Sequence, residues 1–110
     1  LAINIHMPRI SRHRDRCRTG HLCSRTAPVL ASQYTVFAEG KPILKRGDRV
    51  APHVLPNPAY PPVPPKCIPH KAKLTGSSKT VFVRGIGVGR KDDKADFGAM
   101  VGAARTVHAG

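Results

Sequence analysis

The sequence contains very few aromatic residues and no tryptophan. Among 110 residues, aromatic rings occur only in Phe37, Phe82, Phe97, Tyr34 and Tyr60. A chain of this length forms a single modest domain, and with 10 Gly and 11 Pro it cannot build a deep aromatic core. We therefore expect the fold to be stabilised by a bound metal ion, by a partner surface, or by both.

Long apolar runs are also absent. No stretch approaches the roughly 18 apolar residues of a membrane span, and no apolar core follows a basic start as in a signal peptide. The three cysteines, Cys17, Cys23 and Cys67, cannot all pair within one chain. We predict no transmembrane segment, and synthesis in a reducing cytosol that leaves thiols available to a metal.

Acidic residues are scarce, with 6 Asp and Glu against 19 Lys and Arg, and the formal net charge is +13. Such a charge favours an anionic partner, nucleic acid among them. Modules that bind single strands place aromatic residues among the basic ones for stacking, but residues 9–18 and 84–94 contain none. We expect no specific nucleic-acid partner, and keep a small basic metal-binding nucleic-acid-binding protein as the alternative.

An internal repeat is the most informative feature of the chain. Residues 35–48 align without a gap on residues 80–93, with identities at Thr, Val, Phe, a Gly and the final Asp. A third copy is split between the two ends of the chain. Arg12-His13-Arg14-Asp15 provides the basic half with its Asp, and Thr106-Val107-His108-Ala109-Gly110 provides the Thr-Val half.

Each copy is typical of a short β-hairpin. Thr-Val-Phe favours a strand, and the pairs Glu39-Gly40 and Arg84-Gly85 allow a tight turn. The basic residue two or three positions before each Asp predicts a salt bridge that closes the unit. We predict a small all-β cone of three hairpins related by a pseudo-threefold axis, against the alternative of ordinary β-sandwich strands.

Two further segments have distinct compositions. Prolines crowd between Pro52 and Pro69, which predicts a stiff, polyproline-like surface loop. Met7-Pro8-Arg9 is typical of a natural start, so we expect residues 1–6 to be a disordered or non-native leader. Residues 7–110 then form one domain.

Histidines follow two of the closing aspartates. His21 lies six residues after Asp15 and His53 five after Asp48, while His70 follows the proline segment. If the units surround one axis, these three imidazoles converge on it. Converging imidazoles are suited to one Zn or Fe ion.

The fourth ligand stays open at this stage. In the third unit Phe97, which cannot bind metal, stands four residues after Asp93. A thiolate from Cys23 or Cys67, with Cys17 less favoured, or a water molecule would complete the set. His13 and His108 have no comparable placement, so we expect structural roles for them.

The sequence resembles the PAAR family, closest to its phage-type branch. The similarity spans about residues 8–110, and four segments carry it. They are Thr19-Gly20-His21-Leu22-Cys23, Lys41 to Asp48 followed by His53, Cys67 with His70, and Gly76-Ser77-Ser78-Lys79-Thr80-Val81-Phe82-Val83. Within the family pattern, His21, His53 and His70 match the histidine ligands, and Phe97 replaces the cysteine ligand.

The resemblance implies a mechanical role. PAAR proteins are metal-stabilised cones that cap the trimeric β-helix spike of a contractile phage tail or type VI secretion needle and sharpen it for piercing the target envelope. We expect a virion location, made in the host cytoplasm, or a secreted needle tip. Of the 6 acidic residues, Asp15, Asp48 and Asp93 are assigned to the repeats, and no Ser/His/Asp arrangement stands out. We therefore expect neither catalysis nor a small-molecule substrate.

Overall fold

The computed structural model describes residues 7–21, 23–56 and 67–110, which form ten short strands and no helix. The strands are β1 (Arg16–Arg18), β2 (Thr26–Leu30), β3 (Phe37–Ala38), β4 (Lys41–Pro42), β5 (Arg49–Pro56), β6 (Cys67–Lys73), β7 (Phe82–Val83), β8 (Ile86–Gly87), β9 (Lys94–Ala95) and β10 (Gly98–Ala99). The predicted all-β class is confirmed. The leader expected at residues 1–6 lies outside the described residues. Within the described ranges no helix is long and apolar enough to cross a membrane.

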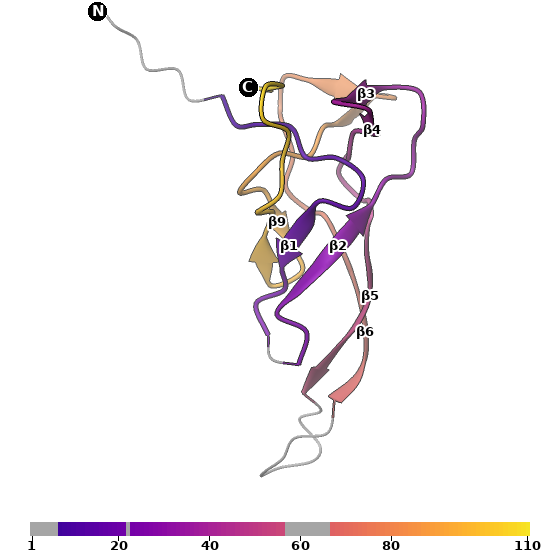
Figure 1. Ribbon diagram of the computed structural model, residues 1–110, viewed down its shortest axis with the longest axis vertical. Helices are drawn as coiled ribbons and strands as arrows, with labels where there is room; N and C mark the ends of the chain where they lie inside the picture. The colour runs from indigo at the N-terminus through magenta and orange to yellow at the C-terminus, as the bar shows by residue number, and fades with distance from the viewer. Residues whose placement is uncertain (1–6, 22, 57–66) are drawn as a thin grey trace, which may run out of the picture.

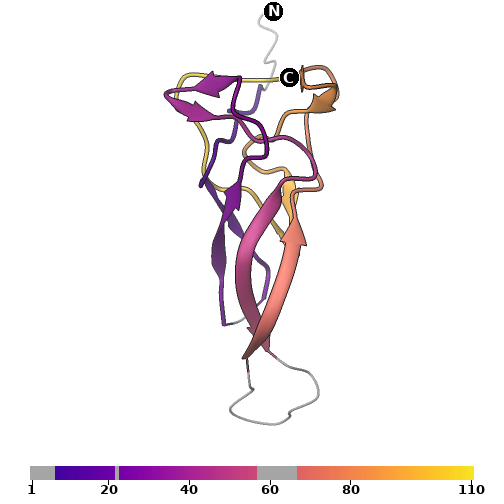
Figure 2. The ribbon, with the colours of Figure 1, turned by 90° about the vertical axis from the view of Figure 1, so that its right-hand side faces the viewer.

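The strands form four antiparallel sheets. One has the order β1-β2-β5-β6, and the others are the two-stranded hairpins β3–β4, β7–β8 and β9–β10. The β3–β4 and β7–β8 hairpins both lie at the broad end of the molecule, on opposite sides of it in Figure 2, while β5 and β6 run together toward the narrower end (Figures 1 and 2). We call the first of these the hairpin end.

Both predicted hairpins are formed, but each first strand begins at the Phe of its Thr-Val-Phe copy and does not include the Thr and Val. Phe37 pairs with Pro42 in β3–β4, and Phe82 pairs with Gly87 in β7–β8. The turn residues Glu39-Gly40 and Arg84-Gly85 all have positive φ, between 50° and 79°. Two positive φ values in a two-residue loop are the requirement of a type I′ turn, whose twist matches that of the strands. A glycine at the second position meets this requirement without steric cost.

Three equivalent turns close the three repeat units. Their ends are Arg12 and Asp15, Lys45 and Asp48, and Arg90 and Asp93. In each turn the Asp carboxylate accepts a hydrogen bond from the backbone N–H of the basic residue, at 2.7, 2.9 and 2.8 Å respectively. The side chains also form the predicted ion pairs, at 3.1, 3.6 and 3.0 Å. The salt bridge expected in every unit is therefore confirmed.

A closed ring of backbone hydrogen bonds joins the three units. Ser11 N–H donates to Gly89 O (2.9 Å), Gly89 N–H to Leu44 O (2.8 Å), and Leu44 N–H to Ser11 O (3.0 Å). Each residue directly precedes the basic residue of its own turn. A three-membered cycle of this kind requires the units to surround one axis, so they are related by a pseudo-threefold arrangement.

The third unit is assembled from both ends of the chain, as the repeat predicts. Ile10 N–H donates to Val107 O at 2.8 Å. The same bond occurs from Ile43 to Val36 O and from Val88 to Val81 O, each at 3.1 Å. The N-terminal and C-terminal segments therefore complete one unit together.

Buried residues also occur in threes. Four sets of equivalent positions are nearly inaccessible: Ile10, Ile43 and Val88; Ala38, Val83 and Ala109; Cys17, Val50 and Ala95; Val29, Leu74 and Met100. All are aliphatic or sulfur-containing, whereas Phe37, Phe82 and Phe97 are 54%, 58% and 72% exposed. The core therefore consists of small triplets and uses no aromatic ring from the described residues.

The proline-rich range is partly strand, which corrects the loop predicted from Pro52 to Pro69. β5 runs to Pro56, β6 begins at Cys67, and Pro69 pairs with Val54. Antiparallel ladders alternate hydrogen-bonded and free positions, and β6 is an edge strand, where proline is tolerated. Pro52 lies at the irregularity between Val50 and His53. The rest of the predicted loop, residues 57–66, lies outside the described residues.

Glu39 links the β3–β4 turn to the C-terminal segment through hydrogen bonds. Its carboxylate accepts bonds from the Thr106 hydroxyl (2.8 Å) and from the backbone N–H groups of Thr106 (3.0 Å) and Arg105 (3.0 Å). It also pairs with Arg12 at 2.8 Å. The hydrogen bonds from Thr106 and Arg105 lower the pKa of Glu39. The carboxylate form is therefore the one that holds the third unit against the first.

The closing turns give a first prediction. Asp48 is buried and accepts bonds from Lys45 N–H and the Ser32 hydroxyl. Asp48→Asn replaces one acceptor by a donor, so we expect a loss of about 1–3 kcal/mol in the free energy of unfolding. The exposed Asp92→Asn, also in a closing turn, should change it by less than about 0.5 kcal/mol. Urea denaturation measures both, and equal losses would contradict the structural role of Asp48.

The Glu39 contacts give a second prediction. Because the folded-state pKa is lowered, the stabilisation is present above the unfolded pKa of about 4.3 and is lost as pH falls through the folded value. Glu39→Gln should therefore lower the Tm at pH 7, and the difference from the wild type should shrink below about pH 4. Melting curves between pH 3 and pH 7 test this. A difference independent of pH would show that the charge of Glu39 is not involved.

Candidate metal centre

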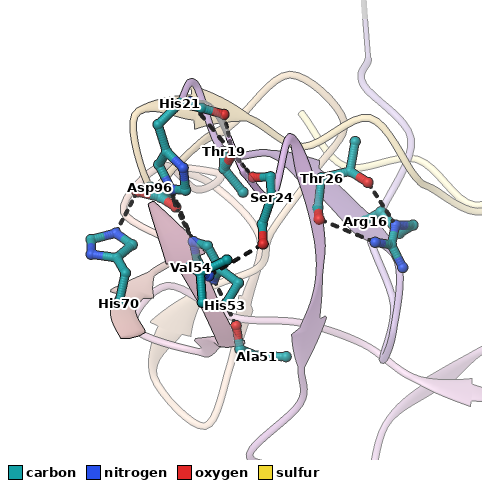
Figure 3. Close-up of polar contacts among 10 residues, drawn as sticks. All are labelled: Arg16, Thr19, His21, Ser24, Thr26, Ala51, His53, Val54, His70 and Asp96. Carbon is teal, nitrogen blue, oxygen red and sulfur yellow. Dashed lines mark hydrogen bonds and ion pairs between the residues drawn. The ribbon is translucent and has the colours of Figure 1, made fainter. Parts of the chain in front are cut away.

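Three histidines from separate segments converge on one point. His53 in β5 and His70 in β6 are cross-strand partners, and His21 follows β1. The His21 and His53 rings stack with centroids 5.0 Å apart, and the His70 ring stands edge-on to both. Figure 3 shows the three side chains directed toward one another.

Asp96 lies at the centre of this group. Its Oδ2 atom is 3.0 Å from His21 Nε2 and 2.7 Å from His53 Nε2, and its Oδ1 atom is 2.9 Å from His70 Nε2 (Figure 3). The Asp96 side chain is only 1% exposed. One carboxylate therefore contacts all three imidazoles in a nearly closed site.

The turn between β9 and β10 positions this carboxylate. Asp96 has a φ of 55°, a conformation that Asp adopts more readily than most residues. Its N–H donates to Lys73 O in β6 (3.3 Å), and the Phe97 N–H donates to Thr19 O near His21 (2.9 Å). The turn is thus fixed both to the strand that carries His70 and to the segment that carries His21.

The nitrogen and oxygen atoms at the centre lie close enough to share protons or a metal ion. His53 Nδ1 donates to Ala51 O at 2.8 Å, which leaves the lone pair of a neutral ring on Nε2. That Nε2 atom lies 3.1 Å from His21 Nε2 and 2.7 Å from Asp96 Oδ2. Lone pairs this close repel unless protons or a metal ion lie between them.

The chemistry of these donors fits a metal ion. The ligand atoms of His21, His53, His70 and Asp96 all lie within 4.8 Å of one another, so the group can hold one ion. Neutral imidazole and carboxylate are both common metal ligands. The Nδ1 bond of His53 to a backbone carbonyl is the outer contact that orients a metal-binding imidazole. We refer to these four residues as the His₃Asp centre.

The ionisation of Asp96 is set by two opposing effects. Burial by itself raises the pKa of a carboxyl group, but the hydrogen-bonding contacts with His70, His53 and His21 outweigh it and lower the pKa of Asp96. Asp96 is therefore an anion at neutral pH. An anionic ligand offsets part of the charge of a bound divalent cation.

The structure brings together the three histidines named from the sequence and adds one residue that the sequence reasoning missed. Phe97 itself does not reach the centre; it stacks on the His70 ring at 5.8 Å. The residue before it, Asp96, supplies the fourth side chain. The available signal was an acidic residue, outside the three closing turns, directly beside the position of the missing ligand.

Neither of the two cysteines whose side chains the structure describes takes the fourth position. Cys23 is disulfide-bonded, which corrects the expectation that its thiol is available to a metal. Cys17 is a free thiol, fully buried in the core. Burial, with the nearby charge of Asp96, raises the pKa of Cys17, so it stays protonated. The side chain of Cys67 lies outside the described residues.

The two remaining described histidines lie away from the centre. His13 Nδ1 accepts a hydrogen bond from Ala31 N–H at 2.9 Å, which is the structural role expected for it. His108 is exposed and forms an isolated bridge with Arg9. Neither belongs to the His₃Asp centre.

Comparison with known proteins does not assign this chain to a family. No protein-family model matches it, and no curated protein matches it significantly. The similarity to the PAAR family therefore stays a prediction from sequence motifs.

The His₃Asp centre gives a third prediction. The purified protein should carry one metal ion per chain, and a chelator should lower its Tm by more than about 5 °C, because the ion links segments that share little core. His53→Ala and Asp96→Ala should each abolish metal retention, measured by elemental analysis. The matched control His108→Ala should retain the ion. Unchanged metal content in both His53→Ala and Asp96→Ala would show that these residues hold no metal.

Proposed function

We propose that this protein is the structural tip of a contractile injection machine, seated on the end of a trimeric β-helical spike. The supporting observation is the pseudo-threefold arrangement of one chain around the Ser11, Leu44 and Gly89 ring. A single chain that meets three identical chains on their common axis must offer each of them a similar surface. Three related units within one chain provide this.

The hairpin end has the character of a docking face. Phe37 and Phe82, at equivalent positions, are 54% and 58% exposed, and Val36 and Val81 beside them are 44% and 37% exposed. Exposed apolar residues gathered on one face are typical of a protein–protein interface. They repeat with the units, as expected for contacts with a symmetric trimer. In the third unit His108 stands at the position of the two phenylalanines.

The His₃Asp centre supports the mechanical part of the proposal. It lies on β5, β6 and the adjacent turns, away from the hairpin end (Figures 1 and 3). A narrow point has little room for a core, so a coordinated ion would stiffen it by linking segments distant in sequence. Three imidazoles and one carboxylate suit a four-coordinate Zn ion, or Fe.

The proposal includes a location and a target. The tip would belong to the virion of a contractile phage, or would be secreted at the end of a type VI needle. In either case it would contact the target cell envelope only transiently and would carry no catalytic activity. The motifs similar to those of the PAAR family support the same assignment.

A small basic metal-binding nucleic-acid-binding protein is the second candidate, and the net charge of +13 favours it. Binding of that kind would fall steeply with salt concentration. Affinity for DNA or RNA that persists at physiological salt, without any binding to a trimeric spike, would favour this candidate over the tip.

The docking face gives a fourth prediction. Phe37→Ser together with Phe82→Ser should weaken binding to the trimeric spike of the same machine by more than about tenfold. The double variant loses two aromatic side chains that docking would bury. Native mass spectrometry of the wild-type complex should give one tip for three spike chains. Isothermal titration would measure the change in affinity.

The matched control is Phe97→Ser, which removes a still more exposed phenylalanine next to the His₃Asp centre. It should leave spike binding unchanged, and the double variant should keep its metal ion. Equal loss of spike binding in the control and the double variant would contradict docking through the hairpin end.

A further inference from the structure

A basic hollow lies on the β2–β5–β6 sheet, and its lining contains no residue of the hairpin end or of the His₃Asp centre. It has a volume of about 620 Å³ and is lined by Leu30 of β2, Arg49, Val50 and Pro52 of β5, and Lys71, Ala72 and Lys73 of β6. Its size is that of a small-molecule site. Neither the metal centre nor the proposed spike contact uses it.

Three of the lining residues are cations on one face of the sheet. Arg49 lies directly opposite Lys73, and Lys71 is two residues from Lys73 on the same strand. Side chains two residues apart point to the same side of a strand. Like charges directly opposite each other destabilise a sheet, so an anion bound among them would relieve this repulsion.

No carboxylate neutralises these cations. Arg49, Lys71 and Lys73 are exposed, and within the described ranges none of them forms an ion pair. By contrast, Arg12, Lys45 and Arg90 are each paired with an aspartate. The positive charge of the hollow is therefore available to an external ligand.

The rest of the lining is apolar and aliphatic. Leu30 is paired with Arg49 and lies beside the cations, and Pro52 lies at the irregularity in β5. None of the hollow's described lining residues has an aromatic side chain on which a nucleic-acid base could stack. Cations beside an aliphatic surface are complementary to a phosphate group that carries an acyl chain.

We propose that this hollow binds an anionic phospholipid. The phosphate lies among Arg49, Lys71 and Lys73, and the first part of an acyl chain lies on Leu30 and Pro52. This inference requires neither the metal ion nor the spike partner. It adds a lipid contact on the side of the protein, between its two ends.

Vesicle co-sedimentation tests the headgroup. Wild-type protein should bind phosphatidylglycerol vesicles and not phosphatidylcholine vesicles at physiological salt. Lys71→Gln with Lys73→Gln should weaken binding by about tenfold or more, because each basic residue near an anionic surface contributes to affinity. The control Lys41→Gln with Lys79→Gln removes the same charge from other exposed positions and should change binding less than about twofold. Equal loss in the two double variants would overturn the site in favour of a net-charge effect.

A second measurement, on the wild-type protein, distinguishes binding of the whole lipid from binding of the phosphate alone. Short-chain phosphatidylglycerol below its micellar concentration should compete with vesicles, whereas inorganic phosphate at the same concentration should not. Equal competition by phosphate would overturn the acyl contact. A single-stranded oligonucleotide that binds more tightly than the vesicles, and loses affinity only in the Lys71 and Lys73 variant, would assign the hollow to nucleic acid instead.

Discussion

The closed ring of three backbone hydrogen bonds is the constraint on which the rest of the fold depends. It brings Ser11, Leu44 and Gly89 to within one hydrogen bond of each other around a single axis. So close an approach limits side-chain size: a Cβ atom at Gly89 would lie 2.5 Å from the Leu74 side chain and 3.3 Å from Leu44 Cβ. The buried triplets around this ring are aliphatic or sulfur-containing, with Leu44, Leu74 and Met100 the largest fully buried side chains. The described core therefore packs without an aromatic ring.

The parts of the fold that the sequence predicted are those encoded by local signals. A Thr-Val-Phe strand, a turn that ends in Gly and an Asp that accepts from the residue three positions before it are each complete within a few residues. Because the same short motifs recur, the third unit could be recognised even though it is divided between the chain ends. In the third unit, the hydrogen bond from Ile10 to Val107 is equivalent to the bonds from Ile43 to Val36 and from Val88 to Val81 in the other two units.

The parts that the sequence did not predict depend on where a turn directs a side chain. Spacing from the closing aspartate placed Phe97 at the position of the missing ligand, but the positive φ of Asp96 directs the preceding side chain inward. The disulfide of Cys23 likewise depends on tertiary proximity. The ends of β5 and β6 in the proline-rich range were not predicted as strands. The number of prolines does not reveal which positions of a β-ladder lack a backbone N–H hydrogen bond and can therefore accept proline.

The His₃Asp centre lies where the threefold likeness ends. The ring and the closing turns use equivalent atoms from all three units, whereas the centre takes two imidazoles from the β5–β6 ladder, one from the segment after β1 and a carboxylate from the β9–β10 turn. Symmetry is therefore kept in the backbone ring and in the closing turns, where each unit supplies the same contact. Symmetry is lost at the His₃Asp centre, where four side chains converge on one point. Three equivalent units cannot supply four equivalent ligands. An ion at this point would join β5, β6 and the β9–β10 turn, which the backbone ring does not hold together.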